Sequence, residues 1–185
     1  MKRVLWVMLL FITWKVQAQG EATRSVFVEV GGASMVYSFN YDFRFDKEKL
    51  DSWGMRVGAG GYKLSDESLF TLPIQATRVM GKGKNYFEVG AGLTFINYTS
   101  TYTVYDYNSY NPSTGQYSSS SDRKEKDYHF ILDIGKTPTV VGTLNIGYRR
   151  IPEDGGFTYR INLTPLFNTN GFWPLFAGVG LGYAF

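Results

Sequence analysis

The sequence predicts an all-β protein, an eight-stranded antiparallel up-and-down transmembrane β-barrel. Three observations predict this fold class: alternating apolar and polar residues in many segments, abundant glycine and aromatic residues, and a carboxyl-terminal strand that ends on phenylalanine. In Leu175–Phe185 the large apolar residues fall mostly on one parity and the glycines on the other. Because successive side chains of a strand point to opposite faces, one face is apolar and the other nearly bare. Such a strand is typical of the wall of an outer-membrane barrel.

The first 18 residues are interpreted as a secretory signal peptide. Lys2 and Arg3 supply a positive start, residues 4–14 form an apolar core, and Val16–Ala18 precedes the expected cleavage site. The apolar core is shorter than the about 20 residues that a membrane helix needs. Cleavage is expected after Ala18, with Gly20 as the alternative, which leaves residues 19–185 as one barrel domain.

Charge and cysteine content exclude several functions. Of the 19 Lys and Arg, three lie in the signal peptide, so 19 minus three leaves 16 against 16 Asp and Glu. A formally neutral mature chain gives no reason to expect nucleic acid as a partner. The absence of cysteine excludes disulfides, cysteine-based metal sites and a lipid-bearing cysteine. We expect no cofactor and no metal.

The first four predicted strands follow the signal peptide. The second strand has the clearest pattern, with Phe39, Tyr41 and Phe43 on one parity and polar residues on the other. Gly31–Ser34 would be a tight connection between the first two strands, or a kink in a single one. Pro73 cannot donate a ladder hydrogen bond, which counts against the fourth strand. The segments are Ser25–Gly32, Ser34–Phe45, Ser52–Tyr62 and Leu69–Met80.

The last four predicted strands bracket a long polar insert, residues 97–138. They alternate in the same way and are Tyr86–Phe95, Val140–Ile151, Phe157–Pro165 and Leu175–Phe185. With eight strands both chain ends lie on the periplasmic side, where the connections near 46–51, 81–85 and 152–156 are short. Short periplasmic turns and longer outer loops are the outer-membrane arrangement, so the insert is expected to be extracellular.

These segments resemble the small outer-membrane β-barrel proteins of Bacteroidota-type bacteria, most of which have no assigned function. The resemblance implies an outer-membrane location and the barrel fold over nearly all the mature chain except the insert, but no particular activity. The motifs that carry it are Val28-Glu-Val-Gly-Gly32, Tyr41-Asp-Phe-Arg-Phe45, Phe87-Glu-Val-Gly-Ala-Gly92, Ile146-Gly-Tyr-Arg149, Tyr159-Arg-Ile-Asn-Leu-Thr-Pro165 and Gly180-Leu-Gly-Tyr-Ala-Phe185.

Seven charged residues fall on the inward parity of the predicted strands. An eight-stranded barrel leaves an interior only wide enough for side chains, and guanidinium groups suit buried carboxylates. We therefore expect a structural ion-pair network that closes the lumen; the alternative is a narrow, porin-like pore for small solutes. The seven residues are Glu29, Asp42, Arg44, Arg56, Glu88, Arg149 and Arg160.

The only histidine, His129, lies in the insert near a serine run and Asp127. A lipid-modifying outer-membrane enzyme centred on His129 is therefore a second alternative, but no triad geometry or oxyanion donor follows from the sequence. We expect an exposed loop histidine and no enzyme activity.

The insert is rich in tyrosine, and tyrosine with serine, asparagine and glycine forms adaptable binding surfaces. The equally weighted structural interpretation is a protruding hairpin that continues the neighbouring strands. The candidate interaction residues are Tyr98, Tyr102, Tyr105, Tyr107, Tyr110 and Tyr117.

The functional prediction is a non-enzymatic structural or interaction subunit at the cell surface of a Gram-negative bacterium. The expected partners are outer-membrane lipid, the barrel-assembly machinery during biogenesis and a larger outer-membrane protein complex. Tyr183 and Phe185 form the terminal signal for outer-membrane targeting. A soluble periplasmic barrel with an internal ligand is a weaker alternative, because the glycine-rich parity carries too little charge for a solvated exterior.

Overall fold

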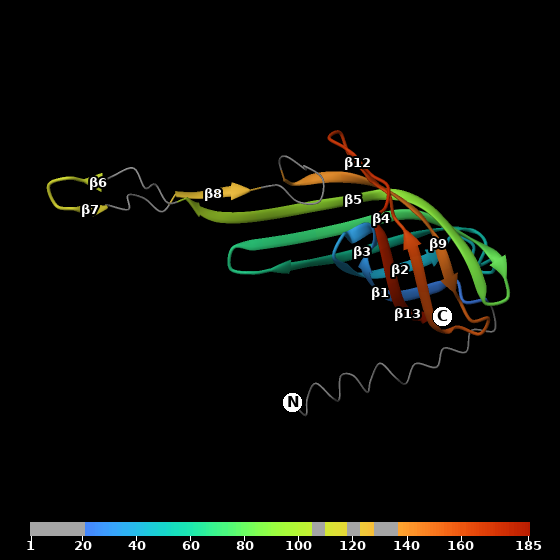
Figure 1. Ribbon diagram of the computed structural model, residues 1–185. Helices are drawn as coiled ribbons and strands as arrows, with labels where there is room; N and C mark the ends of the chain where they lie inside the picture. Colours follow the sequence, from blue (N-terminus) through green and yellow to red (C-terminus); the bar gives the residue numbers. More distant parts are fainter. Residues whose placement is uncertain (1–20, 105–109, 118–122, 128–136) are drawn as a thin grey trace, which may run out of the picture.

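Eight antiparallel strands close into a barrel in the computed structural model, which describes residues 21–104, 110–117, 123–127 and 137–185. Each strand pairs with the next along the chain, and the last pairs with the first, so the sheet has no edge around the barrel (Figure 1). The fold class is as predicted. The barrel strands are β1 (Arg24–Gly31), β2 (Tyr37–Arg44), β3 (Trp53–Lys63), β4 (Glu67–Lys82), β5 (Asn85–Val104), β9 (Thr139–Arg150), β10 (Gly156–Leu163) and β13 (Ala177–Ala184).

The two ends of the barrel differ. The terminal end is where β1 begins and β13 ends, and Arg24 and Phe185 exchange two backbone hydrogen bonds there, of 3.0 and 2.8 Å. At the opposite arm end, part of the sheet continues beyond the barrel. We call this extension the outer arm; it comprises Lys63, Glu67, Ser68, residues 99–104 and β8 (Arg123–Asp127). Figure 1 shows β5 and β8 running out from the barrel side by side, and their residues pair from Ser100↔Asp127 to Val104↔Arg123.

The remaining elements are short. A 3₁₀ turn, η1 (Gly32–Ser34), joins β1 to β2, so the first two predicted strands are separate strands. The other pieces are β6 (Tyr110–Asn111), β7 (Gln116–Tyr117), β11 (Leu166–Phe167) and β12 (Phe172–Trp173). Among the described residues, none of the helical segments has the length and apolar character to cross a membrane.

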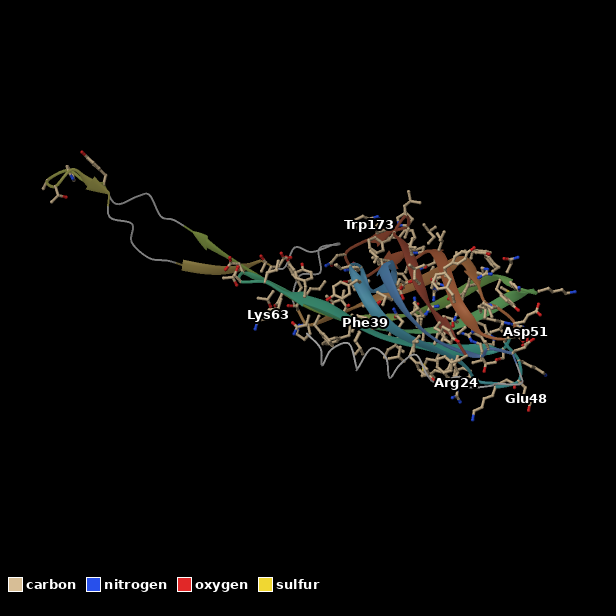
Figure 2. All side chains as sticks on the ribbon, turned by 90° about the horizontal axis from the view of Figure 1, so that it is seen from below. Arg24, Phe39, Glu48, Asp51, Lys63 and Trp173 are labelled. Carbon is tan, nitrogen blue, oxygen red and sulfur yellow. The ribbon has the colours of Figure 1, made fainter. Side chains whose placement is uncertain are left out.

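Side chains alternate around the barrel wall as the sequence predicts. Outward residues are apolar and exposed: Val30 and Phe39 are each 65% exposed and Leu181 is 55% exposed. Inward residues are buried and many are polar. Figure 2 shows the two ends of this wall, with Lys63 at the base of the arm and Glu48 and Asp51 at the terminal end.

Pro73 interrupts only one of its two ladders. Its pairing with Thr94 of β5 is continuous with the neighbouring pairs. On the other side the β3–β4 register passes from Val57↔Ile74 to Gly60↔Thr71 with no pair between. Proline has no N–H to donate, so pairing with β3 is interrupted at Pro73. Continuous pairing with β5 on the other side is enough to keep the strand.

The insert begins later than predicted. β5 continues to Val104 instead of ending at Phe95, so residues 97–104 belong to a strand. Their polar Tyr and Thr side chains resemble a loop in composition, yet both residue types favour strands.

Candidate functional site: a sealed polar lumen and an outer arm

The seven inward charged residues are buried together in the barrel interior. Each is at most 3% exposed, and they come from β1, β2, β3, β5, β9 and β10. Strand parity and closure of the sheet bring these side chains, far apart in sequence, into one volume.

Three of the four arginines lie against the carboxylate of Glu88. Its carboxylate accepts hydrogen bonds from Arg56 and from Arg160, the latter at 2.7 Å, and Arg149 lies 3.7 Å away. The Asn145 amide donates a further hydrogen bond of 3.0 Å to the same carboxylate. Glu88 is thus the acceptor through which β3, β5, β9 and β10 are tied together.

Asp42 forms the second centre of the network. It pairs with Arg44, with Arg149 at 3.2 Å and with Arg56 at 3.5 Å. Arg56 and Arg149 therefore bridge the Asp42 and Glu88 centres. Arg44 also donates to the carbonyl oxygen and the hydroxyl of Thr77, at 3.0 and 2.8 Å.

Glu29 completes the network at its edge, with one oxygen 3.5 Å from Nε of Arg160. The described network thus contains four arginines and three carboxylates, which leaves one formal positive charge in excess.

The aromatic ring of Phe27 lies against two of these cations. The guanidinium carbon of Arg160 is 4.8 Å from the ring centroid and that of Arg56 is 5.2 Å from it. A ring face attracts a desolvated cation, so Phe27 offsets part of the excess charge. From the sequence, Phe27 is not identified as part of the network. The signal for it is a large aromatic residue on the same parity as Glu29.

Inward glycines make room for these side chains. A Cβ atom at Gly180 would lie 2.8 Å from Cγ of Arg160, and one at Gly54 would lie 2.7 Å from the Arg44 guanidinium. The nearly bare inner face of the last strand is therefore the space that a neighbouring arginine fills.

An apolar cluster lies in the barrel interior at the arm end. It consists of inward residues of the strands together with Met35, which follows η1; the η1 residues are all buried. The Thr94 hydroxyl donates a 2.7 Å hydrogen bond to the carbonyl of Ala33 and so holds the turn inside the barrel mouth. The cluster, here called the outer plug, contains Met35, Leu69, Ile96, Tyr98, Val141 and Leu166.

A second apolar cluster lies in the barrel interior at the terminal end. Leu50, from the β2–β3 turn, folds under the barrel, and its N–H donates a 2.8 Å hydrogen bond to Glu21. This inner plug contains Ala22, Leu50, Val79, Tyr86, Ile151 and Ala184. The described interior is thus layered: an apolar plug, a charged middle and another apolar plug.

Tyr98 does not belong to an interaction loop, contrary to our sequence-based assignment. It is 6% exposed, is part of the outer plug, and its hydroxyl donates a 3.0 Å hydrogen bond to Glu67. Strand β5 simply continues past the predicted boundary and keeps Tyr98 on the inward parity. The tyrosine therefore closes the barrel.

The other candidate tyrosines lie farther along the chain. Tyr102 is in β5, and Tyr110 of β6 pairs with Tyr117 of β7. Tyr110 is 53% exposed. Tyr105, Tyr107 and His129 lie outside the described residues.

The predicted targeting residues end the last strand. Tyr183 points outward and is 54% exposed, and Phe185 is held by its backbone pairing with Arg24. Within the described ranges, no group of three or more His, Cys, Asp or Glu residues could hold a metal ion.

The closed antiparallel eight-stranded barrel is the fold class that these elements define, and it is similar to an outer-membrane barrel domain. A solved structure that it resembles is the N-terminal β-barrel domain of Pseudomonas aeruginosa OprF. The TM-score is 0.50 at 15% sequence identity, and the match covers 90% of this chain and 100% of that one. No protein-family model and no curated protein matches the sequence. At this identity the likeness shows the fold alone.

Proposed function

We propose that the protein is an outer-membrane β-barrel of the small Bacteroidota type whose lumen is closed, and that it acts as a non-enzymatic structural or interaction subunit. The observation that carries the proposal is the layered interior. A charged network in which each of the seven residues takes part in an ion pair, flanked by two apolar plugs, suits a structural core better than a conduit.

The apolar exterior supports the membrane location. A soluble protein does not surround itself with exposed residues such as Val30, Phe39 and Leu175, the last of which is 76% exposed. Closure lets the strands pair with neighbours all round the barrel and leaves no open sheet edge, which is what a bilayer demands. In this orientation the terminal end faces the periplasm and the arm faces the cell exterior.

The outer arm supports the interaction role. It carries the sheet beyond the barrel, and the described hairpin β6–β7 presents the exposed Tyr110. We propose that the arm and the residues between its strands contact a larger outer-membrane complex, while Tyr183 and Phe185 address the chain to the assembly machinery during biogenesis.

A hairpin replacement tests the interaction role. Because Val104 pairs with Arg123, residues 105–122 can be replaced by an Asn-Gly turn that keeps β5 and β8 paired. The shortened protein is expected to fold as the wild type does, shown by an unchanged gel shift on boiling, and to lose the partners that co-purify with the wild type. Retention of the same partners would refute the arm as the interface.

A further inference from the structure

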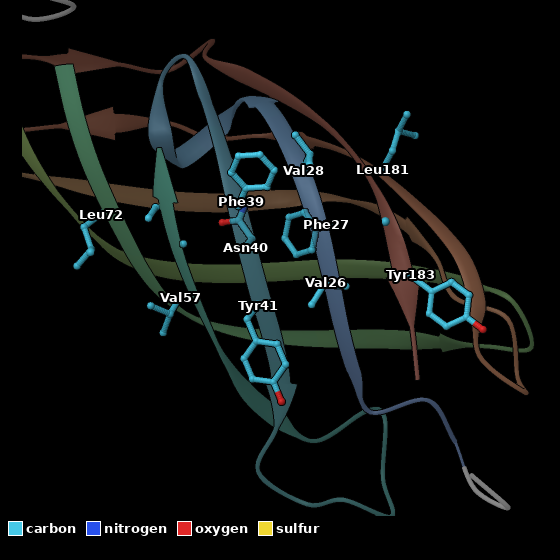
Figure 3. Close-up of a pocket in the computed structure, with 13 residues that line it drawn as sticks. Val26, Phe27, Val28, Phe39, Asn40, Tyr41, Val57, Leu72, Leu181 and Tyr183 are labelled. Atoms are coloured by element: carbon cyan, nitrogen blue, oxygen red, sulfur yellow. The ribbon is translucent and has the colours of Figure 1, made fainter. Parts of the chain in front are cut away.

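A groove in the outer wall of the barrel runs along β1. Its volume is about 720 Å³, and its lining residues come from β13, β1, β2, β3 and β4 (Figure 3). Pockets of this size hold small molecules in other proteins. The groove lies on the apolar exterior, outside the sealed lumen.

Side-chain size along three neighbouring strands creates the part of this groove that lies over β1; beyond β2 the groove continues over Val57, Ala59 and Leu72. The outward residues of β1 are the short Val26 and Val28. Val26 is opposite Tyr41 on one side and Tyr183 on the other. Val28 is likewise flanked by Phe39 and Leu181. A low valine floor therefore runs between two higher walls of mainly aromatic side chains.

Polar groups stand at the terminal end of the groove. Arg24 is the next outward residue of β1 after Val26, and its side chain is exposed. Its backbone is fixed by the two hydrogen bonds with Phe185, while its guanidinium makes no hydrogen bond or ion pair with any residue that the structure describes. Figure 3 shows the hydroxyl group of Tyr41 directed toward this same end, whereas the ring of Tyr183 points away from β1.

We propose that the groove binds one glycerophospholipid of the membrane leaflet at the terminal end. The phosphate is held by Arg24 with the Tyr41 hydroxyl, and an acyl chain lies over Val26 and Val28. This inference rests on the proposed membrane location. An apolar groove that ends in a cation with no partner among the described residues complements an anionic amphiphile, and tyrosines lie at the headgroup level of membrane proteins.

Two variants test the headgroup and the acyl-chain ends separately. Arg24→Gln removes the cation, and Val28→Trp fills the floor; both side chains are outward, so the lumen is untouched. The matched controls are Lys82→Gln, an exposed cation elsewhere at the terminal end, and Ile161→Trp, an outward position on β10. Each protein is reconstituted in phosphatidylethanolamine and phosphatidylglycerol vesicles and extracted in mild detergent, and its retained lipid is counted by native mass spectrometry.

Wild type and both controls are expected to retain one phospholipid. Arg24→Gln and Val28→Trp should reduce this retention by about tenfold, the effect of losing one charge-assisted contact or the bound-chain space. No retained phospholipid on the wild type, equal loss in the controls, or retention of detergent in place of phospholipid would overturn the site. The gel shift on boiling is measured for each reconstituted sample. A shifted protein that retains no phospholipid contradicts the lipid site alone, whereas a protein without a shift contradicts the proposed function as well.

Discussion

At the residue scale, Glu88 is one of the two carboxylates that each pair with three arginines of the buried network. We predict that Glu88→Gln destabilises the barrel by about 3–5 kcal/mol, because Arg56 and Arg160 would lose their nearest charged acceptor while remaining buried. Urea unfolding of the protein refolded in detergent measures the change. Glu153→Gln, in an exposed turn, is the control and should unfold like the wild type. Equal stability of the two variants would show that the network does not hold the barrel together.

Tyr98 and Tyr110, two of the candidate interaction residues, should differ in how much they contribute to stability. Tyr98→Ala is expected to cost about 3–5 kcal/mol, comparable with other large-to-small changes of buried aromatics, because it opens the outer plug. Tyr110→Ala should leave stability unchanged within about 0.5 kcal/mol, since that side chain is exposed. Unfolding midpoints of the two variants check this, and partner capture is expected to fall only for Tyr110→Ala among variants that still fold.

Strand parity alone was enough to predict which charged residues face inward. It could not predict their contacts, because the pairing of Arg160 with Glu88 depends on how β10 and β5 face each other across the closed barrel. It also could not show that Phe27 would lie against two arginines. Tyr98 was misassigned because its neighbours are polar, although its position two residues beyond Ile96 continues the inward parity.

At the element scale, the last strand was the most predictable, because its glycines and its apolar residues alternate without interruption. The physical reason for one of those glycines appears only in the fold. Gly180→Val would force side-chain atoms into the space of Arg160 and is expected to cost about 1–3 kcal/mol.

Leu181→Val, the adjacent outward position, is the control for that substitution and should be nearly neutral, because its side chain faces outward. Thermal or urea unfolding of both variants gives the comparison. A Gly180→Val barrel as stable as the control would mean that Arg160 can move elsewhere in the lumen.

The strand boundaries were less predictable than the strands. Pro73 argued against β4, but one intact ladder with β5 is sufficient to keep it. The end of β5 was placed too early, because hydrophobic alternation stops at the barrel rim while backbone pairing with β8 continues. Hydrophobic alternation marks only the part of a strand that lies in the barrel wall. The outer arm continues past that part, so its strands lack the pattern.

At the scale of the whole molecule, the layered interior predicts that the protein does not conduct ions. In planar bilayers the wild type and Arg160→Ala should both give flat current records, because the two plugs close the lumen independently of that arginine. Reproducible conductance steps that Arg160→Ala alters would contradict the closed lumen and favour the narrow pore.

Gel mobility before and after boiling tests whether the protein forms a closed barrel embedded in the outer membrane. The membrane fraction of expressing cells is separated into inner and outer membranes, and each is run on a denaturing gel unboiled and boiled. We predict that the protein is found in the outer-membrane fraction and migrates differently in the two samples, because the hydrogen-bonded barrel resists detergent until it is heated. A soluble protein with the same mobility in both samples would contradict an outer-membrane barrel, and the exposed apolar side chains would then need another explanation.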